Sequence, residues 1–230
     1  MTRRALLVLA LAASVSAGAC DRIRDEPQFS SANLVDRSVE TVERMRRIQD
    51  LRAFTEMIPS ARGVLILPSV TRAGFIGGAE GGNGVLIARD RAGGWGYPAF
   101  YTLAAASVGL QAGIQNTEII LVIRNDKALN AIVQHQGTLG ADAGVTLGFV
   151  GIGAEAATTT NLGADVVAFS NSAVGLYIGA SLDGAALVRR KDLNEAFYGA
   201  GATARGIVIE GGHQNPRADR LRAVLAGARS

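Results

Sequence analysis

Histidine and cysteine, two side chains central to nucleophilic catalysis and to transition-metal binding, are scarce in this chain. Its 230 residues include two histidines, His135 and His213, and one cysteine, Cys20. A zinc site takes most of its ligands from these two residue types, so the chain lacks the ligands for one. A hydrolase triad needs a histidine beside a nucleophile, and the sequence has no G-x-S-x-G nucleophile elbow. We therefore expect no catalytic residues and no enzymatic activity.

Carboxylates alone could form a site for a hard metal ion, with Asp142, Asp165 and Asp183 as candidate ligands. Each lies near a glycine, and an aspartate in that setting more commonly closes a turn with its own side chain. The sequence therefore predicts neither a bound metal nor a cofactor.

Two glycine-rich segments match phosphate-binding loops only in part. Residues 151–156 (GIGAEA) fit the loose dinucleotide pattern G-x-G-x-x-A. The β-branched residues that follow them predict no helix whose N-terminus would hold a pyrophosphate. Residues 77–84 (GGAEGGNG) lack the Lys-Ser/Thr ending of a phosphate loop, and we interpret them as a hairpin loop. Neither segment predicts nucleotide binding.

The N-terminus has the organisation of an export signal. Residues 1–19 begin with Arg3 and Arg4, continue with an apolar run over 5–15, and end in small residues before Cys20. The sequence Ala-Gly-Ala-Cys resembles a lipobox, whose cysteine receives a diacylglyceryl group and becomes the mature N-terminus. We predict a signal peptide over 1–19, lipid attachment at Cys20 and a polar tether over 20–30. Plain secretion and a retained anchor are the alternatives.

Composition limits the class of protein further. The chain has 48% hydrophobic residues and 29 glycines, too apolar for disorder. Its formal charge of +3 includes Arg3 and Arg4, so the mature chain carries about +3 − 2 = +1. A charge this small gives no support to nucleic-acid binding.

The pattern after residue 30 predicts one α+β domain over 31–230. We expect mainly antiparallel curled sheets, sandwich- or barrel-like, with an N-terminal helix and short peripheral helices. The helix is predicted over 31–58, where apolar residues recur at three- and four-residue steps before Pro59. The other predicted helices are 126–134, 192–198 and 216–226, and the predicted strands include 63–68, 84–89, 118–124 and 203–210.

The region from about residue 61 to 199 resembles the SYLF domain family, which occurs in eukaryotic SH3- and FYVE-containing proteins and in many bacterial lipoproteins. The segments that carry the resemblance are 61–68 (ARGVLILP), 73–78 (AGFIGG), 80–84 (EGGNG), 95–101 (WGYPAFY), 107–113 (SVGLQAG), 139–144 (LGADAG), 155–168 and 179–185 (GASLDGA). The resemblance implies lipid binding and membrane association, with actin binding in some eukaryotic members.

Two functions follow as hypotheses. In the first, the chain is a lipid-binding module on the periplasmic face of a bacterial membrane, with Cys20 as one anchor. A basic helical surface would contact anionic phospholipid, and its candidate residues are Arg37, Arg44, Arg46, Arg47 and Arg52. Arg217, Arg220 and Arg222 of the predicted last helix are the alternative surface. In the second, it is an envelope scaffold that contacts another envelope protein without a lipid ligand.

Overall fold

The computed structural model describes residues 27–74, 77–108, 113–134, 139–140, 144–152, 163–172 and 182–227. Its helical elements are α2 (Pro27–Met45), η2 (Gln49–Leu51), α3 (Arg52–Met57), η3 (Ile58–Ser60), α4 (Asp126–Gln134), α7 (Lys191–Tyr198), α8 (Ala204–Val208), η5 (Pro216–Ala218) and α9 (Asp219–Leu225). Its strands are β1 (Gly63–Gly74), β2 (Gly77–Ala88), β3 (Ala99–Val108), β4 (Gly113–Ile123), β5 (Leu147–Gly151), β6 (Val166–Ser170) and β7 (Ala186–Arg189).

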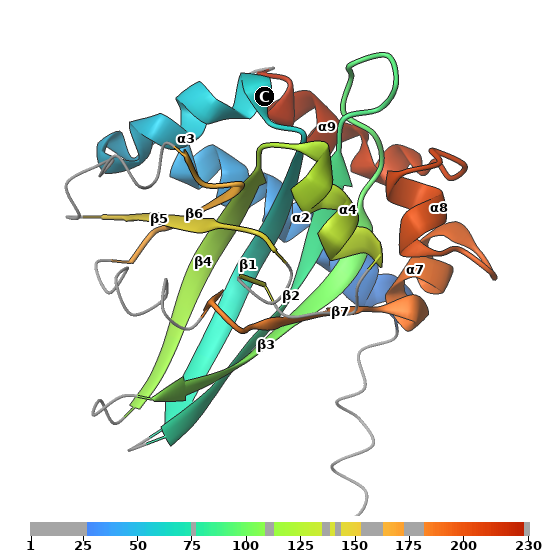
Figure 1. The fold of residues 1–230 in the computed structure, drawn as a ribbon. Helices are drawn as coiled ribbons and strands as arrows, with labels where there is room; N and C mark the ends of the chain where they lie inside the picture. The colour runs from blue at the N-terminus through green and yellow to red at the C-terminus, as the bar shows by residue number, and fades with distance from the viewer. Residues whose placement is uncertain are drawn as a thin grey trace, which may run out of the picture.

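The strands form a single seven-stranded sheet in the order β5-β6-β4-β1-β2-β3-β7. Every neighbouring pair is antiparallel except β5 and β6, which are parallel. The predicted α+β class is confirmed, and so is the mainly antiparallel sheet. The sandwich- or barrel-like arrangement is wrong, because the sheet stays open and helices, rather than a second sheet, cover its faces (Figure 1).

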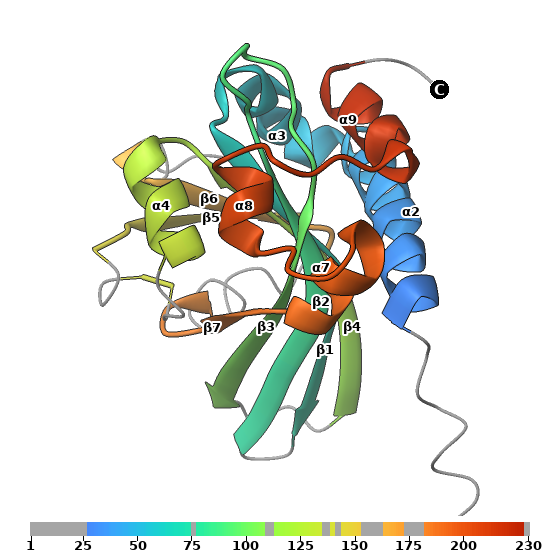
Figure 2. The ribbon, with the colours of Figure 1, turned by 90° about the vertical axis from the view of Figure 1, so that its right-hand side faces the viewer.

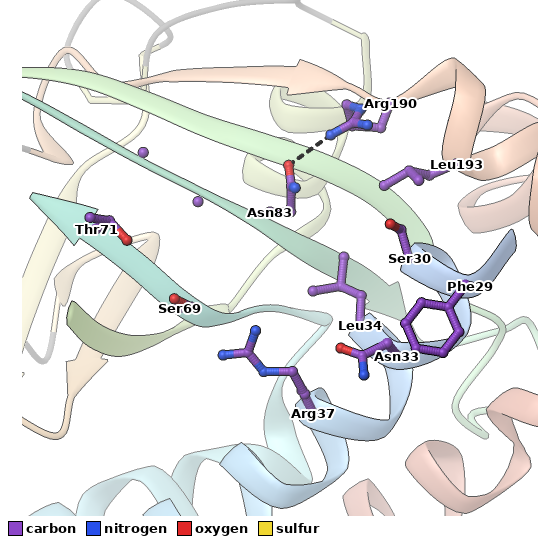
Figure 3. A pocket seen from close by; sticks show the side chains of 12 residues that line it. Phe29, Ser30, Asn33, Leu34, Arg37, Ser69, Thr71, Asn83, Arg190 and Leu193 are labelled. Atoms are coloured by element: carbon purple, nitrogen blue, oxygen red, sulfur yellow. Dashed lines mark hydrogen bonds between the residues drawn. The ribbon is translucent and has the colours of Figure 1, made fainter. Parts of the chain in front are cut away.

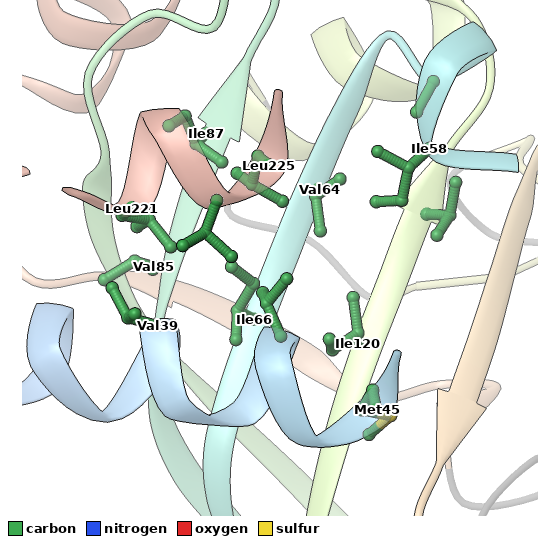
Figure 4. Packing of buried hydrophobic residues seen from close by; sticks show 14 of the residues in the cluster. Val39, Met45, Ile58, Val64, Ile66, Val85, Ile87, Ile120, Leu221 and Leu225 are labelled. Carbon is green, nitrogen blue, oxygen red and sulfur yellow. The ribbon is translucent and has the colours of Figure 1, made fainter. Parts of the chain in front are cut away.

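Alternating residues of the central strands supply two separate cores. Val64 and Ile66 of β1 face a cluster that includes apolar residues of α2, α3, α7 and α9, as Figure 4 shows for part of it. Leu65 and Leu67 face the opposite cluster, which includes residues of α4 and α8. The sheet is therefore the middle layer of three, and its strands are apolar on both faces, as a doubly covered sheet requires.

The long helix predicted over 31–58 is divided. α2 begins earlier, at Pro27, so the last four residues of the predicted tether belong to the helix. Proline suits a first helical turn, because it lacks an N–H group that would have no hydrogen-bond partner there. α2 ends at Met45, and η2 and α3 follow as separate short elements. The division has a physical reason: apolar residues spaced by three drift around a 3.6-residue helix, and a break lets Phe54 and Met45 reach the same core.

The glycine-rich segment 77–84 is part of strand β2 and not a hairpin loop, and β1 does not stop at Pro68. The register between β1 and β2 shifts between Ile66 and Thr71, so β1 bulges there. A Cβ at Gly82 would collide with the carbonyl oxygen of Ser69 in that bulge. The glycines therefore allow β2 to approach the bulge closely.

The segment predicted as a last strand, 203–210, is instead helix α8. Thr203 caps it by accepting a hydrogen bond from the Gly206 amide, and Ile207 is buried against the sheet's second core. The helices predicted near 126–134, 192–198 and 216–226 are confirmed as α4, α7 and α9. The side chain that caps α4 is Asn125, which accepts from the Ala128 amide.

The central strands extend beyond the helical layers at one end of the molecule (Figures 1 and 2). There Ile114 is 80% exposed, and Thr71, Ala79 and Ala104 are exposed as well. The amino end of α2 points toward this end of the sheet (Figure 2). It lies beside Ser69, which is in the bulge of β1. Among the described helices, none is both long and apolar enough to cross a membrane.

Candidate functional site

A cavity of about 310 Å³ lies between the amino end of α2, the bulge of β1 and the start of α7. Its volume is at the lower end of the range of small-molecule sites, about 300–1,000 Å³. The residues that line it are Phe29, Ser30, Asn33, Leu34, Arg37, Ser69, Thr71, Gly81, Gly82, Asn83, Arg190 and Leu193 (Figure 3). The lining is mostly polar, and it contains two arginines and no carboxylate.

Arg190 is fixed in this cavity by three hydrogen bonds. Its Nε and Nη2 donate to the two carboxylate oxygens of Asp192 over 2.8 and 2.6 Å, and its Nη1 donates to Asn83 Oδ1 over 2.9 Å. The bond to Asp192 raises the pKa of Arg190, and the same bond lowers the pKa of Asp192. In the cavity the guanidinium is therefore charged and held in one orientation, and its Nε and Nη2 donors are already bonded to the Asp192 carboxylate.

Arg37 reaches the same cavity from α2. Its Nη2 donates to the carbonyl oxygen of Pro68 over 3.4 Å, a long hydrogen bond, and its side chain is exposed. Pro68 lies in the β1 bulge, so the bulge that the glycines of β2 permit also positions this carbonyl. Figure 3 shows Arg37 and Arg190 on different sides of the cavity, with Asn83 between them.

Several other polar side chains of the lining have no hydrogen-bond partner within the described part of the chain. Within the described ranges, the side chains of Ser30, Asn33 and Thr71 make no hydrogen bond to the protein. Phe29, at the rim, is 67% exposed although it is a large apolar residue. The site therefore offers hydrogen-bonding groups inside and one exposed aromatic ring at its edge.

The arginines predicted as a lipid-binding surface do not form one group. Arg37 lines the cavity, whereas Arg44 forms an ion pair with Glu118 of β4, with 2.9 Å between Nε and Oε2. Arg46 donates to the carbonyl oxygens of Val224 and Leu225, at the end of α9, over 2.6 and 3.2 Å. Its partial burial lowers its pKa. Arg46 thus holds two helices together.

Arg47 and Arg52 remain at the surface. Arg47 lies 4.0 Å from Glu43, and Arg52 forms a 2.8 Å ion pair with Glu56. Their side chains are 75% and 83% exposed, so water weakens both pairs. Of the five predicted residues, then, one lies at the cavity and four lie elsewhere.

Sequence reasoning missed Arg190 and Asn83. Asn83 lies in the segment interpreted as a loop, and Arg190 immediately precedes a helix that was correctly predicted. Residues 189–192, Arg-Arg-Lys-Asp, are all charged, and this cluster could have indicated a site. It does not indicate which residues Arg190 contacts.

Other residues considered from the sequence have structural partners or lie outside the described ranges. Asp165 accepts from the Thr146 amide and from the Asn125 side chain, and the imidazole of His213 packs 5.8 Å from the Tyr198 ring. Among the described residues, no group of three His, Cys, Asp or Glu could hold a metal ion. Of the other candidates, Asp183 is described and its carboxylate lies beside Gly140, whereas Cys20, His135, Asp142 and most of 151–156 lie outside the residues that the structure describes.

Comparison with known proteins identifies the family. Residues 104–228 match the family Ysc84, described as Las17-binding protein actin regulator. This match covers more than half of the chain, and the chain belongs to this family, the SYLF family that the sequence resembles.

Curated relatives extend the similarity toward the N-terminus. LAS seventeen-binding protein 3 of Saccharomyces cerevisiae is 32% identical over 173 residues, which is 74% of this chain and 37% of the yeast protein. Protein YSC84 of the same yeast is 31% identical over 172 residues, 74% of this chain and 36% of its own length. SH3 domain-containing YSC84-like protein 1 of Homo sapiens is 32% identical over 163 residues, 64% of this chain and 47% of the human protein. The chain thus spans less than half the length of each.

Proposed function

We propose that this chain is an exported, lipid-anchored and non-catalytic module that binds phospholipid at the periplasmic face of a bacterial membrane. The observation that carries the proposal is the position of the cavity at the amino end of α2. Cys20 precedes Pro27 by 27 − 20 = 7 residues, which span at most about 25 Å when fully extended. A lipid on Cys20 would therefore hold this end of the domain, with Phe29 and Arg37, close to the bilayer.

Charge supports an approach through this end rather than through the outer face of α2. Apart from Arg37, which lines the cavity, the exposed charged residues of α2 are Asp36, Glu40 and Arg44, and together they carry one net negative charge. Anionic lipid gains nothing from a face without net positive charge. At the amino end, by contrast, Arg37 and Arg190 lie on different sides of one cavity whose lining contains no carboxylate, and Asp192, which pairs with Arg190, lies outside that lining.

Co-sedimentation with liposomes tests the proposal. Protein beginning at Asp21 retains every residue that the structure describes, and it should bind vesicles more tightly as anionic lipid increases and less tightly as salt increases. The Phe29→Ala/Arg37→Met double variant should weaken this binding. The Arg44→Met/Arg47→Met/Arg52→Met triple variant is the comparison, because Arg44 lies 44 − 29 = 15 residues, about 22 Å of helix, from Phe29. A loss confined to the triple variant would reject the end-on approach.

Lipid attachment requires a separate measurement. Mass spectrometry of the mature protein should find Cys20 as the N-terminal residue with a diacylglyceryl group. An unmodified N-terminus in a protein released to the medium would contradict the anchored form.

A scaffold function is the second candidate. It is favoured by the uncovered ends of the central strands, where Ile114 is 80% exposed, and by the names of the relatives, which describe binding to a protein. A folded protein that binds no vesicle of any composition would favour this function over the first.

A further inference from the structure

The cavity beside α2 contains an unusual combination of charges. Arg37 of α2 and Arg190, which immediately precedes α7, approach it from segments far apart in the sequence, and none of its lining residues carries a negative charge. Asp192 neutralises Arg190 from outside the lining, and Arg37 makes a single long hydrogen bond to a carbonyl. Within the described residues Arg37 forms no ion pair, and the carboxylate that pairs with Arg190 lies outside the lining, so the lining itself carries a net positive charge.

We propose that this cavity binds a phosphate group between Arg37 and Arg190, and that Asp192 competes with the phosphate for Arg190. The proposal rests on the proposed function in one respect, since the headgroup of a phospholipid is one source of such a group. A small soluble phosphate compound is the other source, and the chemistry that recognises the group is the same.

The distribution of donors fits phosphate better than carboxylate. Guanidinium groups bind both anions through paired N–H donors. A carboxylate, however, presents two oxygens in one plane, whereas a phosphate presents oxygens in several directions. Donors come from several sides here: Arg37 from α2, Arg190 from the start of α7, and the Thr71 hydroxyl from β1. A volume of about 310 Å³ also leaves room for the group to which the phosphate is attached.

Asp192 gives the site a built-in competitor. It occupies both Nε and Nη2 of Arg190, the two donors that a phosphate would use most effectively. Its side chain is 51% exposed, so it can rotate into water when another anion takes its place. Asn83 bonds the third nitrogen and keeps the guanidinium oriented during the exchange. Removing the Asp192 charge should therefore strengthen anion binding.

Titration calorimetry on protein beginning at Asp21, at fixed ionic strength, tests this site. The probes are inorganic phosphate and glycerol 3-phosphate in solution, followed by vesicles of phosphatidylglycerol and of phosphatidylcholine. Arg37→Met and Arg190→Met should each weaken phosphate binding about tenfold, since each removes a charge-assisted contact. Asp192→Asn should tighten it severalfold. Arg52→Met removes an equal charge outside the cavity and should leave binding unchanged, and thermal unfolding of each variant confirms that it is folded.

The outcomes distinguish the sources and the two proposals. Weakened binding of both glycerol 3-phosphate and phosphatidylglycerol vesicles in the same variants would identify a lipid headgroup, and an effect limited to soluble phosphates would identify a soluble ligand. Absence of saturable phosphate binding would overturn the inference. So would equal binding by Arg37→Met, Arg190→Met and Arg52→Met. If Arg37→Met and Arg190→Met leave phosphate binding unchanged and also bind anionic vesicles as the wild type does, the phosphate site is wrong while the proposed function stands.

Discussion

Replacing Asn194 with alanine should loosen the junction between α7 and the sheet. Asn194 is 1% exposed, and its Oδ1 accepts a hydrogen bond from the Phe100 amide over 3.0 Å. Its Nδ2 donates to the carbonyl oxygens of Arg190 and Phe100 over 2.8 and 3.4 Å. β7 ends at Arg189, so the side-chain amide of Asn194 continues the hydrogen bonding along this edge of β3.

The loss of stability caused by the replacement depends on which buried polar groups are left without any hydrogen-bond partner. The carbonyl of Phe100 still accepts from the Arg190 amide, and the carbonyl of Arg190 still accepts from the Asn194 amide. The amide of Phe100 loses its acceptor, and Phe100 is fully buried. One orphaned buried donor costs about 1–3 kcal/mol. With about 2 kcal/mol lost, Tm should fall by roughly 4–8 °C for a domain of this size.

Thermal and urea unfolding measure the stability change, and hydrogen exchange measures its location. The Phe100 amide should lose protection in Asn194→Ala more than amides of β4 do. Asn130→Ala is the matched control: Asn130 is also in a helix and bonds a carbonyl four residues away, but it is only half-buried, so its loss should cost less than about 0.5 kcal/mol. Equal stability of the two variants, or unchanged protection at Phe100, would refute the reasoning.

Three further changes have definite expected outcomes. Tyr101→Phe should leave the free energy of unfolding unchanged or raise it by up to about 1 kcal/mol in chemical denaturation, because the buried Tyr101 hydroxyl has no partner in the described part of the chain. Gly84→Ala should destabilise by about 3 kcal/mol in the same assay, because the new Cβ would collide with the carbonyl of Ile66 across the bulge. Hydrogen bonding, first of all from the Thr146 amide, lowers the pKa of Asp165 from its ordinary 3.8. Because the folded-state pKa is lowered, the ionised Asp165 stabilises the protein fully at pH values above the unfolded-state pKa of about 3.8. This stabilisation is lost as the pH falls from there through the folded-state pKa, so Asp165→Asn should reduce the acid sensitivity of Tm.

Elements with complete local signals could be predicted from the sequence. The helix at 126–134 follows Asn125, which caps it, and the strand near 118–124 is a run of β-branched and apolar residues buried on both faces. In both places the residues that determine the structure are neighbours in the chain. Local propensity and burial then favour the same conformation.

Elements that depend on distant partners could not be predicted in this way. The run Ile207-Val208-Ile209 favours a strand by propensity, yet the cap at Thr203 and burial against the second core make it helical. The continuation of β1 past Pro68 depends on glycines of β2, which lie beside the bulge only after the sheet has formed. Tertiary contacts override the local preference in both cases.

The same limit applies to the site. The arginines near the N-terminus are neighbours in sequence, but their partners are distant: Glu118 lies 74 positions after Arg44, and Val224 lies 178 positions after Arg46. Asn83 and Arg190, which meet at the cavity, are separated by 107 positions. The chain contains many more arginines than lysines, and only the fold shows which arginines have a structural use.

The preference for arginine over lysine itself has a structural explanation. Lys127 and Lys191 are the only lysines of the chain. Arginine can donate in several directions at once, which suits it to binding carbonyl groups at the ends of elements. Arg46 does so at the end of α9, Arg222 donates to the Trp95 carbonyl, and Arg89 donates to carbonyls at Ile58 and Gly93.

These arginines are therefore part of the scaffold, and their number says little about ligands. Arg37 differs from them, because its single bond to a carbonyl is long and its side chain is exposed. Arg190 differs in another way, because within the described residues its guanidinium bonds side chains only, and the carboxylate that holds it is exposed enough to be displaced. A ligand would compete with little at Arg37 and with one replaceable anion at Arg190. By this comparison the positive charge at the cavity remains available for binding.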